Sequence, residues 1–523
     1  MSGLIRATGS ITLCTLASRI LGLARDILMT RLFGANWVQG TFLVAWTLPN
    51  LMRRFLGEGA LSASLIPAYS KTRVLEGPEA ARRLLAEVVG AVVTILLPFA
   101  ALVSIASLLL PGSAVPAPAD KGAEAGALLI RLNSILFLYA LPVCLTALYS
   151  GAANSLGLFA VPAAVPIVLN VFWIAALALA PLLGANGDPG IALWTAAALL
   201  AAGFAQLALV LWPLWRRGAL LFPRFGLPKR GTAAFSVFAA MAPMVLGMSL
   251  SQISSLIDQG LAYYLVAPGA VTYVYLANRL LLFPHALTAL SVAVAVFPRM
   301  AEEATRKDRA RLRETLDLAA GATVLVTLPA ALGLVSLGED VVRVLFESPK
   351  FGAEQIAPAT LTACSLVVGL PFVGLAQLHA RGFYAVGDSG TPAKLAAWLV
   401  LANAGLGVLL LAATNLGTAG LALASTATST ANALWLRAKF ARHAPRGKGI
   451  AGAWLRSAAA TAAMCAALPV LRLCGQEAPR LDRALGNLLF PIACGAAIYT
   501  AALRVMRSPE LDALLARLRR GLR

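Results

Sequence analysis

The sequence predicts an all-α polytopic membrane protein with about fourteen transmembrane helices. Its 523 residues are 59% hydrophobic and only 13% charged, and the mean hydropathy is +0.80. This composition is too apolar for a soluble protein of several domains. Apolar runs of roughly 20 residues, enough for a helix to cross a hydrocarbon core of about 30 Å, recur along the whole chain. They lack the period-2 alternation of a barrel strand, so helices are the expected spanning elements.

The apolar runs and the breaks between them give the expected organisation. In chain order, the spans are expected at residues 8–33, 37–69, 84–111, 125–153, 158–183, 189–215, 233–266, 270–300, 312–338, 355–384, 391–413, 417–441, 451–473 and 484–506. The stretch RRGALLFPRFGLPKRG separates two blocks of about six spans with Pro, Gly and charges. We therefore predict an N-lobe at 1–215, a basic cytoplasmic linker at 216–232, a C-lobe at 233–443, and a C-terminal helix pair with a basic tail at 444–523.

The net charge of +20 does not indicate nucleic-acid binding, because Lys and Arg gather in alternate loops. Basic clusters lie at residues 71–83, 216–230, 299–313 and 437–448, and the chain ends in RLRRGLR. The positive-inside rule places these loops and both termini in the cytoplasm, as an even number of spans requires. A mixed-charge loop at 339–354 is the exception on the outer side. No small-residue cleavage site follows the first apolar run, so we expect a retained first helix.

The first two spans carry charges that a lipid-facing helix would exclude. A charged side chain at the bilayer centre costs roughly 2.5–3.5 kcal/mol on insertion scales. These residues must therefore face a watery cavity or a partner, and an anionic substrate is the expected partner. Seven residues apart on a helix, Arg19 and Asp26 share a face, so Asp26 could orient or neutralise an arginine when no substrate is bound. The charged residues of these spans are Arg19, Arg25, Asp26, Arg31, Arg53, Arg54 and Glu58.

The two blocks also resemble each other. In the first, WTLPNLMRR lies on the arginine-bearing helix and the block of helices continues to SLIPAYSK; in the second, SLSQISSLIDQG precedes VYLANRLLLFP and AVFPRMAE. Internal repeats with interrupted helices place a substrate site between the halves, near the midplane of the membrane.

Five segments carry a resemblance to a known family. ASRILGLARD, LPNLMRRFLGEGALSASLIPAY, ANRLLLFP, LFESPKFG and RGFYAVGDSGTP together resemble the MurJ (MviN) family of lipid II flippases, within the multidrug/oligosaccharidyl-lipid/polysaccharide exporter superfamily. The resemblance implies two six-helix lobes in a V around a central cavity, and a final helix pair that helps form a groove for a polyprenyl tail. It implies transport of lipid II, the undecaprenyl-diphosphate-linked disaccharide-pentapeptide, from the inner to the outer leaflet by alternating access.

The resemblance also implies site residues. Cavity arginines that bind the diphosphate are expected at Arg19, Arg25, Arg53 and Arg279, with support from Asp26 and Glu58. Guanidinium groups suit this role because they bind phosphate oxygens bidentately and stay charged.

The chain departs from its relatives at three acidic positions. Gly40 stands where relatives often carry an acid, Asn278 where they carry Asp, and Leu282 where some carry Glu, so a salt-bridge gating scheme cannot simply be carried over.

The coupling mechanism has a weaker basis in the sequence. Some relatives have a sodium site, to which Asp258, Asn403 and Thr426 could contribute oxygens here, but Gly407 stands where a second acid is expected. Hard cations need several oxygen ligands, so pairing of Asp258 with a base, proton sensing, or coupling to the membrane potential stay open. We expect no bound cofactor and no metal site.

Enzymatic chemistry is not expected. The three histidines are far apart in sequence, and neither an HExxH-like pattern nor a P-loop is present. Asp388 is expected to be a turn or cap residue. A flippase for another polyprenyl-diphosphate glycan and a cation-coupled drug exporter of the same superfamily are the alternatives. Organic cations would favour buried carboxylates over arginines, which argues against the exporter. Expected partners are lipid II, membrane lipids and other cell-wall synthesis proteins.

Overall fold

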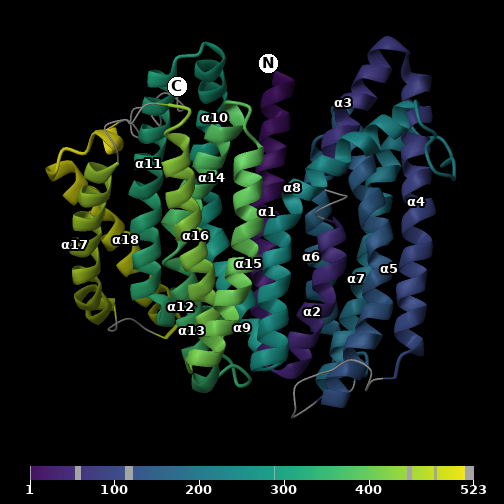
Figure 1. Cartoon of the computed structure of the whole chain (residues 1–523). Coiled ribbons are helices and arrows are strands. Elements are labelled where there is room, and N and C mark those ends of the chain that lie inside the picture. Colours follow the sequence, from purple (N-terminus) through teal and green to yellow (C-terminus); the bar gives the residue numbers. More distant parts are fainter. Residues whose placement is uncertain are drawn as a thin grey trace. The chain divides into compact units, whose positions relative to one another are not determined.

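The computed structural model describes residues 2–53, 60–111, 122–185, 187–287, 289–444, 450–475 and 480–512. Within these ranges every regular element is a helix, as Figure 1 shows. The predicted all-α class is confirmed. The chain folds into two compact units, Met1–Thr272 and Tyr273–Arg523.

The first unit contains the helices that carry most of the predicted site. They are α1 (Ser2–Phe33), α2 (Trp37–Met52), α3 (Ala60–Leu75), α4 (Pro78–Leu109), α5 (Gly122–Ser155), α6 (Ala160–Leu179), α7 (Gly187–Arg216), α8 (Ala233–Leu261) and the π-helix η3 (Ala262–Val266). Because α8 packs against α3 and α4, the compact unit extends beyond the linker at 216–232. The predicted lobes, which follow membrane topology, stay a prediction.

The second unit begins within the first turn of α9. Its helices are α9 (Ala270–Leu287), α10 (Ala289–Thr305), α11 (Arg309–Ser336), α12 (Gly338–Phe346), α13 (Ala353–Val367), α14 (Leu370–Ala385), α15 (Gly390–Ala413), α16 (Thr418–Phe440), α17 (Ala451–Gly475) and α18 (Arg480–Val505). Its main core gathers apolar side chains from α10, α11, α14 and α16, among them Leu316, Phe383 and Phe440.

Each expected span coincides with one helix or a pair of helices. The span at 355–384 contains two helices, α13 and α14. In the spans at 37–69 and 270–300, residues 54–59 between α2 and α3 and residue 288 between α9 and α10 lie outside the described residues. Within the described ranges, nine helices are long and apolar enough to cross a membrane. The total of fourteen therefore stays a prediction.

One short helix in the mixed-charge loop was not predicted. Helix α12 buries Val342 and Phe346, while Arg343 on its exposed side donates from Nε to Glu339 Oε1 over 3.0 Å. A nine-residue amphipathic helix is too short to give a clear signal among charged neighbours.

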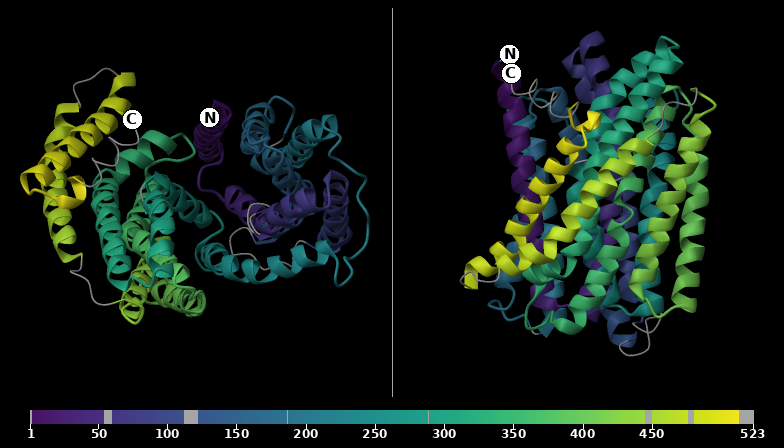
Figure 2. Two further views of the ribbon diagram at one scale, coloured as in Figure 1. Left: turned by 90° about the horizontal axis from the view of Figure 1, so that it is seen from above. Right: turned by 90° about the vertical axis from the view of Figure 1, so that its left-hand side faces the viewer.

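The C-terminal helices α17 and α18 pack side by side, and α17 also packs against α11 (Figure 2). Tyr499 of α18 donates its hydroxyl to Leu325 O of α11 over 2.5 Å, and Arg456 of α17 pairs with Glu510 over 2.6 Å. The first bond connects the helix pair to α11, and the second joins α17 to the segment that follows α18.

The basic linker lies along α4 as an extended strap, which we define as residues 217–232. Arg224 N donates to Ala86 O and Gly226 N donates to Thr94 Oγ1, each at a distance of 3.0 Å. A Cβ atom on Gly90 would lie 1.9 Å from Arg224 O. The strap therefore needs a glycine at this point of α4, because its backbone approaches the helix more closely than a side chain permits.

Candidate functional site

The clearest charged site in the first unit is the pair formed by Arg25 and Asp26 on α1. Arg25 Nη2 lies 2.7 Å and Nε 3.0 Å from the same oxygen, Asp26 Oδ1. Both residues are buried, with exposed fractions of 6% and 3%. The sequence predicted that Asp26 could neutralise an arginine, and in this structure its partner is Arg25.

Helix α6 positions the Arg25 side chain. Arg25 Nη1 donates to Asn170 Oδ1 over 3.1 Å, and Asn170 in turn donates to Ser18 O of α1 over 3.1 Å. The Arg25 guanidinium lies over the Trp173 ring, with Cζ 4.3 Å from the ring centroid. The group is thus held by an anion, an amide oxygen and an aromatic face, which together offset much of the cost of burying its charge.

An aromatic cluster supports this arrangement from α2 and α5. Trp46 of α2 meets Trp173 edge to face with ring centroids 5.0 Å apart, and Tyr139 of α5 lies 5.2 Å from Trp46. Tyr139 donates to Gln206 Oε1 of α7 over 3.3 Å. The position of Arg25 therefore depends on packing among four further helices.

Arg53 is held in a different way at the end of α2. Its Nε and Nη2 lie 3.1 and 3.0 Å from Asn50 Oδ1, one turn earlier on the helix. Arg53 is half-buried. Arg54 and the supporting residue Glu58 lie outside the described residues.

Arg19 and Arg31 are exposed on α1. Arg19 and Asp26 were expected to share a face, but their environments differ. Arg19 is exposed, whereas Asp26 is buried and pairs with Arg25. The exposure of Arg31 fits the snorkelling role that such residues have near a membrane face.

Arg279 lies on α9 in the second unit and is half-buried. Its Nη2 donates to the Tyr275 hydroxyl over 2.9 Å, and its Cζ lies 5.0 Å from the centroid of the same ring. Asn278 and Leu282 are both exposed. Asn278 donates to Val274 O of its own helix over 2.9 Å.

Gly40 has a structural explanation. A Cβ atom there would lie 1.6 Å from Pro268 O, in the turn between η3 and α9. The start of α2 approaches this turn so closely that an acidic side chain does not fit.

The residues considered for cation coupling make protein contacts. Asn403 Oδ1 accepts from Ser425 Oγ over 3.2 Å, whereas Thr426 Oγ1 donates to Ser365 O over 2.7 Å. The hydroxyl of Thr426 thus bonds to the end of α13, while Asn403 bonds to a neighbouring position of α16. Asp258 lies in the other compact unit. Among the described residues, no group of three His, Cys, Asp or Glu side chains could hold a metal.

Asp388 has the role expected from the sequence. Its Oδ1 accepts from Thr391 N over 3.0 Å and its Oδ2 from the Thr391 hydroxyl over 2.7 Å, in the turn before α15. His443 Nε2 lies 3.3 Å from Oδ2. These contacts are typical of a turn and of helix capping.

Sequence reasoning missed Asn170, Trp173 and Tyr275 as residues that position arginines. Asn170 carried a usable signal, since it is a polar residue in the apolar run VPIVLNVFW. Trp173 and Tyr275 carried no such signal, because Trp and Tyr are common in membrane helices.

Comparisons with known proteins agree on one family. A family model described as "Lipid II flippase MurJ" matches residues 29–478. The chain is 31% identical to the probable lipid II flippase MurJ of Rhizobium tropici, over 81% of this chain and 78% of that one. It is also 31% identical to the lipid II flippase MurJ of Burkholderia cenocepacia, over 75% of each chain. The relative from Rhizobium meliloti, a probable lipid II flippase MurJ, is 28% identical over 99% of this chain and 97% of its own.

Solved structures show the same fold. A structure of lipid II flippase MurJ in an inward closed conformation matches with a TM-score of 0.76 and 21% identity, over 95% of this chain and 99% of that one. An inward-facing multidrug resistance MATE family transporter of the MOP superfamily matches with a TM-score of 0.64 and 15% identity, over 82% and 95%. At these identities the structural matches show the fold alone.

Proposed function

The chain belongs to the MurJ family of lipid II flippases, and we propose that it moves lipid II from the inner to the outer leaflet by alternating access. It is a multi-pass membrane transporter and not an enzyme. Lipid II carries the building block of peptidoglycan, so the activity would serve cell-wall synthesis and cell shape. The observation that carries the proposal is the oriented, buried guanidinium of Arg25.

We propose that a phosphate oxygen of the substrate replaces Asp26 on Arg25. In this structure, Nε and Nη2 of Arg25 both donate to the same carboxylate oxygen, Asp26 Oδ1. A diphosphate offers the same edge two oxygens, one for each nitrogen, which is the stronger bidentate arrangement. Asn170 and Trp173 would keep the guanidinium oriented during the exchange. The substrate would therefore bind more tightly to a state in which Arg25 is released from Asp26. Such a difference in affinity between two states is what allows a ligand to drive a conformational change.

Arg53 and Arg279 would complete the binding of the diphosphate from each unit. Among the contacts of these two guanidinium groups are the neutral oxygens of Asn50 and Tyr275. An ionised phosphate oxygen is a stronger acceptor than an amide or phenol oxygen and would displace them. Exposed Arg19 would attract the anionic head group before it is bound.

We also propose that both termini and the basic loops face the cytoplasm. Reporter tags at Arg83, Lys229 and Lys307 should report the cytoplasm, and a tag at Gly187 the outer side. A cytoplasmic report from Gly187 would contradict the orientation of the first unit.

Coupling to Na+ through Asp258, Asn403 and Thr426, or to the membrane potential, stays a prediction. Transport into the outer leaflet should be measured with and without Na+ at a fixed potential. Loss of transport on removal of Na+ would support the cation site.

Rescue tests the proposed function directly. The chain should restore growth and outer-leaflet lipid II in a strain depleted of its own lipid II flippase. An Arg25→Ala variant of equal abundance is the control and should not rescue. Rescue of a mutant lacking a flippase for another polyprenyl-diphosphate glycan, without rescue of the first strain, would contradict the proposal.

A further inference from the structure

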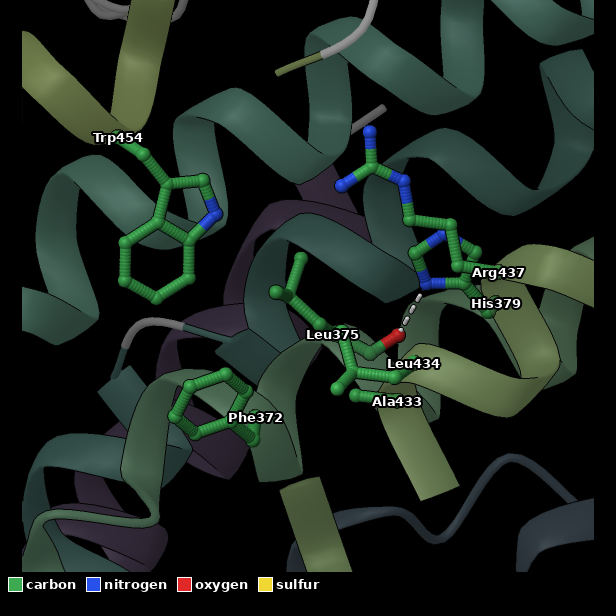
Figure 3. Close-up of a pocket in the computed structure, with 7 residues that line it drawn as sticks. All are labelled: Phe372, Leu375, His379, Ala433, Leu434, Arg437 and Trp454. Atoms are coloured by element: carbon green, nitrogen blue, oxygen red, sulfur yellow. Dashed lines mark hydrogen bonds between the residues drawn. The ribbon is translucent and has the colours of Figure 1, made fainter. Parts of the chain in front are cut away.

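A cavity of about 260 Å³ lies among α14, α16 and α17, wholly within the second unit. In Figure 3, the side chains of Arg437 and His379 lie together at one side of this cavity. Phe372, Leu375 and Trp454 line the rest, and the rings of Phe372 and Trp454 stack with centroids 5.6 Å apart. The cavity thus combines an apolar wall with a basic edge.

The polarity of the cavity changes along the helices. Arg437 lies three residues before the end of α16, or about 4.5 Å, and His379 lies about 9 Å before the end of α14. Leu375 and Phe372 lie about 15 and 20 Å from the same end of α14. On the proposed topology these ends face the cytoplasm. The basic edge therefore lies near the depth of lipid head groups, and the apolar wall lies at the depth of acyl chains.

Arg437 is available to bind an anion. Within the part of the chain that the structure describes, its guanidinium has no hydrogen bond or ion pair. None of the residues that line the cavity is acidic. On α11, which packs against α14, Asp317 is already paired with Arg313 over 3.1 Å. His379 directs Nδ1 to Leu375 O over 2.7 Å, so its ring is fixed against the wall.

Exposed apolar side chains surround the cavity in sequence. Leu434 on its rim is 57% exposed, and the neighbouring side chains Trp435 and Leu455 are 51% and 72% exposed. In a membrane helix, exposed apolar side chains of this kind contact acyl chains. A ligand would therefore enter from the bilayer and not from water.

We propose that this cavity binds an anionic phospholipid of the cytoplasmic leaflet, with its phosphate on Arg437 and one acyl chain against Phe372, Leu375 and Trp454. Basic pockets between transmembrane helices on the cytoplasmic side suit anionic head groups. Lys439 follows on the same helix end and adds to the positive potential.

The size of the cavity restricts the occupant. Pockets for whole drug-sized ligands measure about 300–1,000 Å³, so 260 Å³ holds only part of a ligand. One segment of an acyl chain fits this requirement, while the rest of the lipid stays in the bilayer. The disaccharide-pentapeptide of the proposed substrate is too large for the cavity, and competition with a polyprenol tests whether the substrate's own tail binds there instead.

Native mass spectrometry of the purified full chain tests the proposal. Phosphatidylglycerol and phosphatidylcholine with the same acyl chains should be titrated separately. The first phosphatidylglycerol should bind about tenfold more tightly than phosphatidylcholine, and Arg437→Gln should remove this preference. The matched control is Arg442→Gln, which loses the same charge at an exposed position five residues later and should keep the preference.

A second variant tests the apolar wall without changing charge. Ala433 lines the cavity, and Ala433→Leu should fill part of it and weaken the binding of both lipids. Each variant is compared with the parent by thermal unfolding, and the test uses those that fold. Equal affinity of the parent chain for the two lipids, unchanged preference in folded Arg437→Gln, or displacement of phosphatidylglycerol by a neutral polyprenol would overturn the proposal. None of these outcomes depends on flipping activity.

Discussion

Arg25 presents two nitrogens, Nε at 3.0 Å and Nη2 at 2.7 Å, to one oxygen of the next residue, Asp26. Adjacent residues on a helix point about 100° apart and do not normally face each other. The pair forms because Asn170 and Trp173 of α6 hold the guanidinium on the side toward which Asp26 turns. A contact between neighbours in sequence therefore depends on a helix that begins more than 130 residues later.

Removal of Asp26 should destabilise the protein. Asp26→Ala leaves a buried guanidinium without its anion, and breaking a buried ion pair from one side costs about 3–5 kcal/mol. We expect a lower thermal unfolding midpoint and less protein in the membrane. The control is the double variant Arg25→Gln/Asp26→Asn, which removes both charges and keeps hydrogen-bonding groups. We expect the double variant to reach a higher membrane level than Asp26→Ala but to remain inactive in transport. If the double variant regained both its membrane level and transport, Arg25 would serve stability alone.

The forked shape of arginine should matter for transport. Arg25→Lys and Arg53→Lys keep the positive charge but cannot offer the Nε and Nη2 edge to a diphosphate. We expect near-normal membrane levels and strongly reduced lipid II on the outer leaflet. Arg31→Lys, at an exposed position, is the matched control and should transport normally. Full activity of both test variants would mean that only a diffuse positive potential is needed.

Arg279 should be required for transport but not for folding. Arg279→Ala removes the only proposed diphosphate contact in the second unit, so transport should be lost while the amount of folded protein stays the same. Tyr275→Phe keeps the ring under the guanidinium and removes one neutral hydrogen bond, worth about 0.5–1.5 kcal/mol. Its transport should fall by at most about tenfold. An alanine variant that is stable and fully active would rule out a clamp from both units.

Gly40 should not tolerate a side chain. Gly40→Ala places a Cβ atom 1.6 Å from Pro268 O, and such overpacking typically costs about 1–3 kcal/mol. Gly40→Asp, which adds a larger and charged side chain, should be worse. Gly405→Ala on α15 is the control, since nothing lies within 4 Å of its Cβ position and alanine favours a helix by up to about 1 kcal/mol. Equal unfolding midpoints for Gly40→Ala and the parent would contradict the close contact.

Asp388 should contribute a pH-dependent part of stability. Hydrogen bonds from the Thr391 backbone and hydroxyl, and a smaller one from His443, lower the pKa of Asp388 from its ordinary 3.8 although burial opposes this. A carboxylate with a lower pKa in the folded state stabilises the fold above its ordinary pKa, and this contribution disappears as pH falls through the lowered value. The parent should therefore be more stable than Asp388→Asn at neutral pH, and the difference should shrink in acid. A difference that is constant down to about pH 3 would contradict this assignment.

The fold class and most helix positions could be predicted because apolar runs of sufficient length have few other solutions. The short helix α12 could not, since it is amphipathic and lies among the charged residues of the loop at 339–354. The presence of charge on α1 was predictable from Arg25 and Asp26, but the direction of these side chains was not. That direction depends on Asn170, which is distant in sequence, and on the packing of aromatic rings that have no distinctive spacing.

The strap along α4 also limits how far the start of α8 can move away from α4. As free chain, the 16 steps from Arg216 to Thr232 would reach roughly 55 Å. With Gly226 bonded to Thr94, only six steps separate that anchor from Thr232, which caps α8 by accepting from Phe235 N over 3.2 Å. Six steps reach at most about 20 Å. As long as the Gly226 bond holds, the start of α8 must stay within that distance of Gly226, and so close to the middle of α4.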